Sequence, residues 1–512
     1  MNSRRWTLGV ILLLGTGLRL PSLLHAGLWR DEAYLYVELS APSFAQFFHR
    51  FSITEYFPPL YFVLMYAWTA VAGFSEVALK LPSFIFSVLT IAAVYRLARI
   101  AAGWVTGLIA AFLFAIMPVA IVYAGDARSY SLLALLIALL AAAYIQLLET
   151  PSRGRFLQTS LLALLVVSTH YLGLIALTVL AVLGFTVRTR LRNVLWALLA
   201  LLIGAAPFVF WVPVLQGQLA LGLPWKAPAT PSERAANLLM FLLHSVPAES
   251  WWAGLALAAA ATAAFLSGSF RSKVAYLGAA FLCIIALIAG LGLTDLRYVY
   301  PFYGLIAVFE AWAIVGAYSA IRAKNLIWRS VGAAAGSLVA IFTLALGVTS
   351  AIAAATPHSG IRTLVAADPP TPRSAYVVAP DYIAATFFYY TRERKPAYIG
   401  FVRENNAEFF RAAGYARDWN DPFALQRTEC SIAALSRVHP TLIYVVDKRA
   451  HNQWHVPYAR VWNLLAFLKT HYALNAVHAF AGSNESVLEY RFIVSPREGG
   501  RYCPHGPESQ RK

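Results

Sequence analysis

Long apolar stretches recur through the first 355 residues, and they constrain the fold more than any other feature of the sequence. Only 13% of the 512 residues are charged, about half the share found in soluble domains. The sequence therefore predicts a polytopic α-helical membrane protein of about 11 spans. We place these spans at residues 6–24, 81–99, 104–123, 131–148, 157–170, 171–187, 194–214, 250–268, 274–293, 300–320 and 330–355.

The first apolar run follows Arg4 and Arg5, as the core of a signal peptide would. No small-x-small cleavage motif follows this run, and the chain beyond it is predominantly membrane-embedded by the same criterion. We therefore expect an uncleaved first span.

The basic residues predict the orientation of the spans. Although the formal net charge is +17, these residues stand at the ends of apolar runs and do not line one face, so nucleic-acid binding is not indicated. With the N-terminus in the cytoplasm, 14 of the 22 basic residues before position 356 fall on the cytoplasmic side, as the positive-inside rule requires. The clusters are Arg4/Arg5, Arg96/Arg99, Arg153/Arg155, Arg188/Arg190/Arg192, Arg271/Lys273 and Arg322/Lys324/Arg329.

One apolar segment, Pro58 to Gly73, has only 16 residues and is not counted as a span. Counting it would reverse every later loop and move the basic clusters to the outside. We predict that it is a juxtamembrane helix in a long outer loop at about 25–80. Leu238–Val246 has the composition of a similar short element.

The character of the chain changes at Thr356. A linker rich in proline precedes three short strand patterns, SAYVVAP, TLIYVV and VLEYRFIV, and helical patterns surround Ala384–Tyr390, Asn406–Ala413 and Val461–Leu468. The sequence thus predicts a transmembrane domain over 1–355 and an extracytoplasmic soluble α/β domain over 356–512. Of the three cysteines, Cys283 lies in an apolar run, so only Cys430 and Cys503 could pair.

Acidic residues are scarce in the predicted membrane domain, where 11 of the 24 in the chain occur. Two of them, Asp31 and Glu32, are adjacent in LWRDEAYLY, next to Arg30 and just after the first span. A charge close to a bilayer is costly, which favours a functional role. The alternative is a solvated loop with an Arg–Asp surface pair.

Further candidates face the same predicted outer compartment. Arg128 in GDARSY and Arg297 in TDLRYVY each stand beside a tyrosine at a span end, where they could bind a lipid phosphate or anchor the headgroup region. His170, before Tyr171, is either a hydrogen-bonded interfacial residue or a ligand. Glu55 either acts as a second acid or favours the start of the following helix through its dipole. Glu310, inside an apolar span, has no assigned functional role, and its position suggests a helix-helix hydrogen bond with a neutralised carboxyl.

No nucleotide-binding glycine loop, Walker motif or metal-spaced Cys/His cluster occurs in the sequence. A transferase without a nucleotide site needs another activated donor. A lipid-linked donor presented from the bilayer agrees with acidic and basic residues on the outer side.

The ordered series LWRDEAYLY, EYFPPLYFVLMYAW, GDARSYSLL and STHYLGLIAL resembles bacterial members of the protein O-mannosyltransferase and aminoarabinose transferase superfamily. These are GT-C glycosyltransferases, similar to glycosyltransferase family 39 and to the RgtA/B/C/D-like group. The resemblance covers about residues 5–190, and RYVYP at 297–301 more loosely. It implies a GT-C-like fold, a polyprenyl-phosphate-sugar donor and transfer on the extracytoplasmic face of the inner membrane.

The resemblance also implies roles for individual residues. Asp31 matches the catalytic acid of the family and would be the base for an inverting attack, with Glu32 orienting it or binding substrate. Arg128 and Arg297, with Tyr298, would bind the donor phosphate. Glu55 matches a functional acid of aminoarabinose transferases, but Tyr56 follows it where those enzymes have a basic residue. The remaining candidates for substrate contact are Arg30, Asp126, Tyr130, His170 and Tyr171.

Some relatives are linked to a divalent cation, and Glu55 with His170 would be the ligands to test here. The acceptor is a protein, a glycan or a glycolipid. Two other functions stay open at this stage. A transporter or flippase of lipid-linked precursors would place charges at mid-membrane, where only Glu310 lies, and a non-catalytic envelope scaffold would tolerate loss of Asp31.

Overall fold

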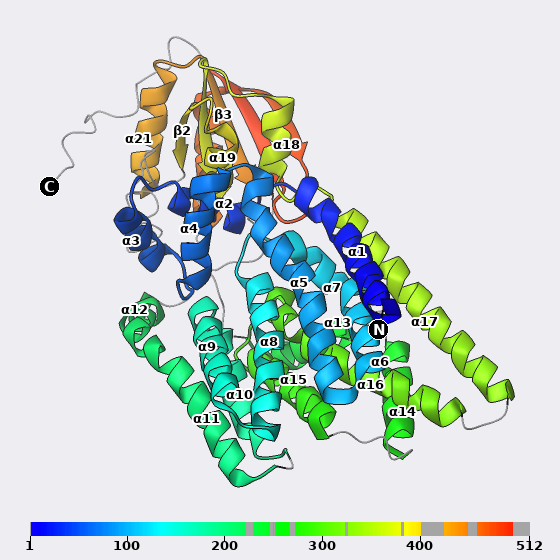
Figure 1. Cartoon of the computed structure of the whole chain (residues 1–512). Coiled ribbons are helices and arrows are strands. Elements are labelled where there is room, and N and C mark those ends of the chain that lie inside the picture. Colours follow the sequence, from blue (N-terminus) through cyan, green and yellow to red (C-terminus); the bar gives the residue numbers. More distant parts are fainter. Residues whose placement is uncertain are drawn as a thin grey trace. The chain divides into compact units, whose positions relative to one another are not determined.

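A computed structural model describes residues 2–187, 189–221, 229–245, 249, 251–266, 272–322, 326–379, 383–400, 424–448 and 458–494. The chain packs into two compact units, whose elements are labelled in Figure 1. Unit 1 comprises Met1–Leu24, Phe57–Val212 and Pro228–Ala355, and unit 2 comprises His25–Tyr56, Pro213–Ala227 and Thr356–Lys512. The predicted domain boundary at residue 356 is therefore one of several points where the chain passes from one unit to the other.

Unit 1 is helical. Its helices are α1 (Asn2–Leu24), α4 (Leu60–Ala72), α5 (Glu76–Ala102), α6 (Trp104–Ile116), α7 (Pro118–Val122), α8 (Tyr130–Glu149), α9 (Arg153–Thr169), α10 (Leu172–Gly184), α11 (Leu191–Ala205), α13 (Pro231–Ser245), α14 (Trp251–Leu266), α15 (Ser272–Gly290), α16 (Tyr303–Arg322) and α17 (Leu326–Ala353). Short 3-10 turns η1 (Tyr123–Gly125), η2 (Ala206–Trp211), η4 (Leu296–Tyr298) and η5 (Tyr300–Phe302) complete it.

Six helical segments of the described chain are long and apolar enough to cross a membrane, or seven if the bent pair α6–α7 is one span. Large apolar side chains are exposed along them, including Leu13 on α1 and Leu202 on α11. Such surfaces are unfavourable in water and favourable against lipid. The polytopic helical fold is thus confirmed, while the number of about 11 spans stays a prediction.

Helix ends in unit 1 follow local sequence signals. Ser75 and Ser152 cap α5 and α9 by accepting hydrogen bonds from backbone amides of the first turn. Gly103, with φ of 100°, separates α5 from α6 in a conformation that other residues rarely adopt. Pro118 begins α7, and the axes of α6 and α7 differ by 61°.

The centre of unit 1 is α8, which packs against α5 and α9 (Figure 1). Its 20 residues span about 30 Å at 1.5 Å per residue. α5 packs in turn against α6, and α1 lies against both α5 and α6. α8 is largely buried, and its two ends lie about 30 Å apart.

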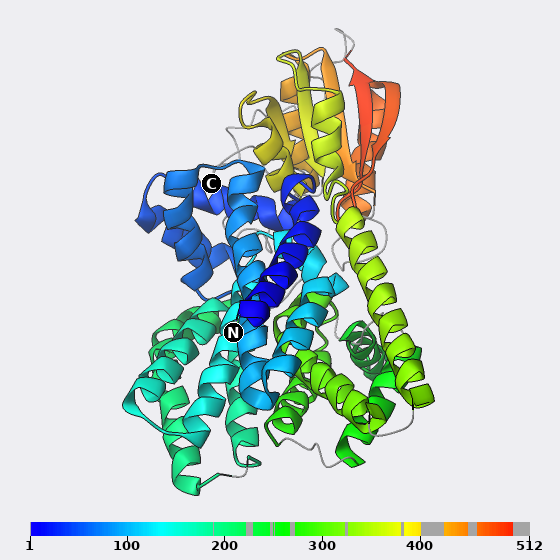
Figure 2. The same ribbon diagram turned by 45° about the vertical axis from the view of Figure 1, so that its right-hand side comes forward.

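Unit 2 contains a five-stranded sheet in the order β2-β1-β3-β5-β4, which can be followed in Figure 2. The strands are β1 (Ser374–Ala379), β2 (Ala397–Gly400), β3 (Thr441–Asp447), β4 (Ala473–Phe480) and β5 (Val487–Ile493). β2, β1 and β3 are parallel, and β5 is antiparallel to both β3 and β4. The three strands predicted from sequence are β1, β3 and β5, so these predictions are confirmed.

Helices cover both faces of the sheet. α21 (Ala424–Ser436) and α22 (Tyr458–His471) pack on one face, and α18 (Gly360–Ala367) and α19 (Ala384–Thr391) pack on the other. Alternate residues of the parallel strands point into the two cores, and both are apolar because both faces are buried. The predicted helices at 384–390 and 461–468 are α19 and part of α22. The predicted helix at 406–413 and Cys503 lie outside the described residues.

Unit 2 also contains the segment that follows the first span. It forms α2 (Arg30–Leu39) and α3 (Phe44–Thr54), and α12 (Val212–Leu221) also contributes to the unit. α2 packs against α19, where the ring of Tyr36 meets those of Phe388 and Tyr389 at 6.0 and 5.2 Å between centroids. The helix that carries the acidic pair is therefore built onto the C-terminal α/β domain.

Candidate functional site

Asp31 lies in the first turn of α2. Trp29 is the N-cap residue of α2 and has an extended backbone, and the helix begins at Arg30. The side chain of Asp31 is 25% exposed, and one carboxylate oxygen accepts a hydrogen bond of 3.0 Å from Nε of Arg30. A carboxylate at a helix N-terminus is stabilised by the helix dipole. Asp31 thus combines a fixed backbone with access for a substrate.

Glu32 has a different environment from its neighbour. Its side chain is fully buried, and Oε2 accepts a hydrogen bond of 3.2 Å from the backbone N–H of Trp29. Nδ1 of His358 lies 3.9 Å from the same oxygen. A glutamate at the third helical position that bonds back to the start of the helix is one half of a capping box. Glu32 thus supports the turn that carries Asp31.

Glu55 ends α3 and does not begin the next helix. Its amide donates to the carbonyl of Phe51, and its own carbonyl accepts a hydrogen bond of 2.6 Å from Nε2 of Gln218. The residue is buried at 6% exposure. The alternative of a dipole effect on the following helix does not apply, because α4 starts only at Leu60.

In unit 1, Arg128 is surrounded by aromatic side chains. Its guanidinium lies over the rings of Phe57 and Phe62, at 5.1 and 5.7 Å from their centroids. Its carbonyl accepts a hydrogen bond from Ser83, and its amide donates to the carbonyl of Asp126, so the GDARSY loop is held at both sides. The side chain is 7% exposed. A desolvated cation on aromatic faces attracts an anion strongly.

His170 joins this group through its ring. The ring centroid lies 4.8 Å from that of Phe57 and 5.4 Å from that of Tyr130. Nδ1 accepts a hydrogen bond of 3.0 Å from the amide of Leu172, so the proton of the neutral ring belongs on Nε2. That Nε2 is buried and has no hydrogen-bond partner among the described residues. His170 is thus a buried donor.

We call Phe57, Arg128, Tyr130, His170 and Tyr298 the Arg128 cluster. Tyr298 belongs to it because its ring meets that of Tyr130 edge to face at 6.1 Å. The cluster joins a cation and a buried N–H donor in one apolar place. Such a set suits phosphate oxygens.

Arg297 forms an ion pair with a neighbouring carboxylate. Nε and NH2 lie 2.7 and 2.6 Å from Oδ2 of Asp295, and the hydroxyl of Tyr123 donates to the other oxygen. Burial would raise the pKa of Asp295, but Arg297 and these hydrogen bonds hold it below its usual value. Its partner neutralises much of the charge of Arg297.

Two further candidates are placed by the structure. Tyr171 points toward η2, where its hydroxyl accepts a hydrogen bond of 3.0 Å from Nε1 of Trp211 and its ring meets that of Phe208. Asp126 is buried at 7% exposure in the turn that precedes Arg128. Tyr171 is therefore directed to a different neighbourhood from His170, although the two are adjacent in sequence.

Glu310 lies in α16 and is fully buried. Neither carboxylate oxygen has a hydrogen-bond partner within the described ranges. The helix-helix hydrogen bond that its position suggested is thus not found among these residues.

His170, one of the two residues proposed as metal ligands, is oriented as a hydrogen-bond donor. Within the described part of the chain, no three His, Cys, Asp or Glu side chains gather as a metal site would require. Nε2 of His170 carries the proton as long as Nδ1 accepts from Leu172, so this ring has no free lone pair to offer. The geometry assigns His170 to hydrogen bonding.

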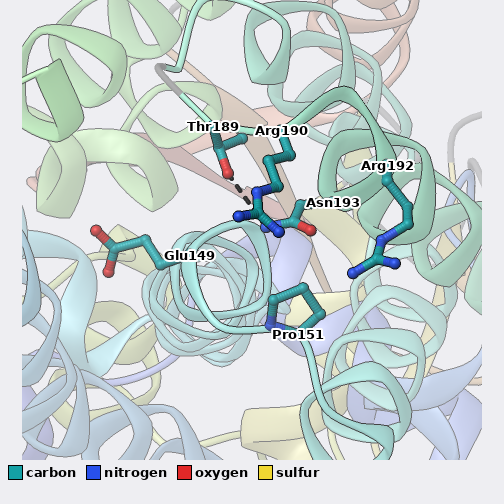
Figure 3. Close-up of a pocket in the computed structure, with 6 residues that line it drawn as sticks. All are labelled: Glu149, Pro151, Thr189, Arg190, Arg192 and Asn193. Atoms are coloured by element: carbon teal, nitrogen blue, oxygen red, sulfur yellow. Dashed lines mark hydrogen bonds between the residues drawn. The ribbon is translucent and has the colours of Figure 1, made fainter.

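A cavity of about 670 Å³ lies elsewhere in unit 1 (Figure 3). It is lined by Glu149, Pro151, Thr189, Arg190, Arg192 and Asn193. Glu149 ends α8, whereas Tyr130 of the Arg128 cluster begins it, so about 30 Å of helix separates the two. The cavity is lined by residues at the predicted cytoplasmic end and does not belong to the candidate site.

Comparison with known proteins identifies similar sequences and folds. Residues 57–212 match the family of dolichyl-phosphate-mannose-protein mannosyltransferases. The chain resembles ArnT from Cupriavidus metallidurans in the apo state, with a TM-score of 0.61 and 14% identity over 98% of this chain and 100% of ArnT. No protein of curated function matches it in sequence.

The structure also resembles an oligosaccharyltransferase from Archaeoglobus fulgidus in the apo form. The TM-score is 0.56 and the identity 14%, over 96% of this chain and 74% of the archaeal one. The GT-C-like fold that the short motifs implied is confirmed over almost the whole chain.

Proposed function

We propose that the protein is a membrane glycosyltransferase that moves a sugar from a polyprenyl-phosphate-linked donor to an acceptor on the extracytoplasmic face of the inner membrane, with inversion. The observation that carries the proposal is the placement of Asp31. Asp31 is a partly exposed carboxylate in the first turn of α2, whose other side is buried. These are the requirements for a base that meets a diffusing acceptor. The fold of the chain resembles that of ArnT.

The donor class follows from two relatives and from the Arg128 cluster. ArnT from Cupriavidus metallidurans has been solved bound to undecaprenyl phosphate, and the archaeal oligosaccharyltransferase AglB with an inhibitory peptide and a dolichol-phosphate. The cluster of this chain offers a cation and a buried donor suited to the same phosphate chemistry. The acceptor is a peptide, glycan or glycolipid hydroxyl.

The proposed reaction is one displacement at the anomeric carbon. Asp31 takes the proton of the acceptor hydroxyl while its oxygen forms a bond to this carbon on the face opposite the phosphate. The bond from the anomeric carbon to the phosphate oxygen breaks, and its electron pair leaves with the polyprenyl phosphate. Arg128 and the Nε2–H of His170 stabilise the charge that grows on that phosphate. Arg297 and Tyr298 were assigned the same role from sequence, and the ion pair with Asp295 offsets part of the charge that Arg297 would contribute to it.

The test is transfer by the purified protein in vesicles with polyprenyl-phosphate-linked sugars, read as release of polyprenyl phosphate. Asp31→Asn should lower the rate by about 100-fold or more, as loss of a general base does. Glu38→Gln is the matched control, because Glu38 is a buried acid in the last turn of the same helix. Full activity of Asp31→Asn would reject Asp31 as the base. If cells that carry Asp31→Asn also kept their surface glycan, a non-catalytic scaffold would be favoured.

A further inference from the structure

The N-terminal turn of α2 receives a hydrogen bond from the C-terminal α/β domain. The first backbone amides of a helix have no partner within it. In α2, Glu32 satisfies the amide of Trp29, and Oε2 of Glu485 accepts a hydrogen bond of 3.2 Å from the amide of Arg30. A side chain 455 residues away thus caps the turn that carries Asp31.

Glu485 is itself rigidly placed. Its side chain is 2% exposed, and the hydroxyl of Thr386 donates to the same Oε2 at 3.1 Å. Its carbonyl accepts a hydrogen bond of 2.6 Å from the amide of Gly360, and its amide donates to the carbonyl of His358. A Cβ on Gly360 would lie 2.3 Å from the carbonyl oxygen of Phe480, so only glycine permits this close approach.

A second set of contacts holds the coil before α2. The hydroxyl of Tyr390 lies 2.7 Å from the amide of Leu28 and donates to its carbonyl, and the amide of His358 donates to the carbonyl of Ala26. The approach to α2 and its first turn are therefore both fixed by residues of the α/β domain. Asp31 is the next residue after the amide that Glu485 holds.

We propose that Glu485 is a positioning residue for Asp31, which it fixes by capping the first turn of α2. This inference rests on the proposed function, in which Asp31 is the base. A misplacement of the reacting groups by about 1 Å can cost about 100-fold in rate. An unsatisfied amide at the start of a helix allows such a movement, because the first turn then frays.

The protonation state of Glu485 suggests the informative variant. Burial and the nearby charge of Asp447 raise its pKa to about 8, against the opposing effect of Arg30, so the carboxyl is largely neutral at pH 7. Glu32 and His358 are the other titratable groups of this neighbourhood. A neutral carboxyl accepts from Arg30 through one oxygen, and so does the amide of glutamine. Glu485→Gln should therefore preserve the cap, while Glu485→Ala removes it.

The first measurement needs no activity. Hydrogen–deuterium exchange of the full-length protein should show exchange at Arg30 and Asp31 about 10-fold faster in Glu485→Ala than in the wild type, and unchanged in Glu485→Gln. Glu489→Ala is the matched control, since Glu489 is a buried acid on the nearby β5 but faces Arg491 and His478. Unchanged exchange in Glu485→Ala would overturn the inference.

The second measurement is transfer kinetics per folded molecule. Glu485→Ala should lower kcat about 10- to 100-fold with KM for the lipid donor within about twofold, and Glu485→Gln should restore kcat. In the Asp31→Asn background, Glu485→Ala should lower kcat no further. A further multiplicative loss in that background would show that Glu485 affects the rate independently of Asp31 and would overturn the positioning role.

The outcomes separate the two proposals. If Asp31→Asn is fully active, the proposed base is wrong, whatever Glu485 does. If Asp31→Asn is inactive while Glu485→Ala keeps the wild-type kcat, only the positioning role is wrong.

Discussion

At the scale of single residues, two arginines that look alike in sequence differ in their partners. The guanidinium of Arg128 lies over the rings of Phe57 and Phe62, and that of Arg297 forms an ion pair with Asp295. We predict that Arg128→Gln weakens binding of undecaprenyl phosphate about 10- to 100-fold, the value of a charge-assisted hydrogen bond. Fluorescence or calorimetric titration of the protein in nanodiscs measures this.

The control removes both charges of the Arg297–Asp295 ion pair at once. Arg297→Gln alone would leave Asp295 buried without its cation. The double variant Asp295→Asn/Arg297→Gln should bind within about threefold of the wild type. A loss as large as that of Arg128→Gln would return Arg297 to the phosphate site that the sequence suggested.

His170 should act as a hydrogen-bond donor and not as a metal ligand. Because Nε2 is buried and donates to nothing among the described residues, His170→Phe should lower donor affinity about 10-fold, while keeping the ring contacts with Phe57 and Tyr130. His170→Gln, which retains an N–H, should bind almost normally. Treatment with EDTA should leave the transfer rate within about twofold. Loss of activity with EDTA, recovered by one divalent cation, would contradict this assignment.

Glu485 predicts a pH-dependent stability. Its pKa is raised in the folded state, so the folded protein keeps a proton that the unfolded chain releases, and stability falls as pH rises from about 4.5 to about 8. Glu485→Gln cannot lose this proton. The difference in Tm between Glu485→Gln and the wild type should therefore grow in favour of the variant from pH 5 to pH 8. A constant difference would mean that Glu485 is ionised throughout.

At the scale of elements, a buried arginine supports the break between α6 and α7. Pro118 cannot donate to the carbonyl of Phe114, and the extended backbone of Met117 separates α6 from α7. Arg19 on α1 donates to the carbonyls of Phe114 and Ala115 at 3.1 and 2.7 Å, and to Ser87. The guanidinium therefore replaces the bonds that the proline removes.

Arg19→Met should destabilise the protein by about 2–3 kcal/mol. The substitution relieves the cost of a charge at membrane depth, about 2.5–3.5 kcal/mol at the centre and less near the ends. It also loses several charged hydrogen bonds of about 1.5–3 kcal/mol each, and the losses prevail. Thermal unfolding in detergent tests this, with Arg5→Met as the control on the exposed start of the same helix. An equal Tm for Arg19→Met and wild type would contradict the role.

The elements that could be predicted from sequence are those with a local signal. Long apolar runs gave the helices of unit 1, and β-branched runs gave β1, β3 and β5. β4 was not predicted, because its residues are mostly exposed and alternate weakly, and its pairing with β5 is decided by distant residues. Asp31 could be proposed from sequence because acids are rare around it. Glu485 could not, because it is one of 13 acids after residue 355 and only tertiary contacts distinguish it.

At the scale of the whole chain, the residues predicted to be cytoplasmic and those predicted to be outside lie at opposite ends of unit 1. Lys273 reaches both Glu149 and the carbonyl of Ile100, and Asn193 donates to the carbonyl of Leu148. These residues lie next to four of the predicted cytoplasmic clusters, so the clusters share one end of the unit. Arg128, His170 and Tyr298 gather at the other end of α8.

The same grouping supports the exclusion of the Pro58–Gly73 segment from the spans. The helix in this segment, α4, has 13 residues, or about 20 Å, against about 30 Å of hydrocarbon. If α4 crossed the bilayer, every later loop would change sides, and the arginines at 153, 155, 190 and 192 would face outward, against the positive-inside rule. Ser22, near the end of α1, lies against Gly125, so the first span leaves unit 1 at the Arg128 end.

Reporter fusions test which end faces the cytoplasm. Fusions after Ser152 and after Arg190 should read cytoplasmic, and fusions after Pro42 and after Pro372 should read extracytoplasmic, because these pairs lie on opposite sides of an odd number of predicted spans. Pro42 is the decisive position, since it follows α2 directly. A cytoplasmic reading there would place Asp31 on the wrong side for a lipid-linked donor in the outer leaflet. The proposed reaction would then be wrong. A mixed reading at Pro42 alone, with the other three as expected, would instead point to an error in the first span.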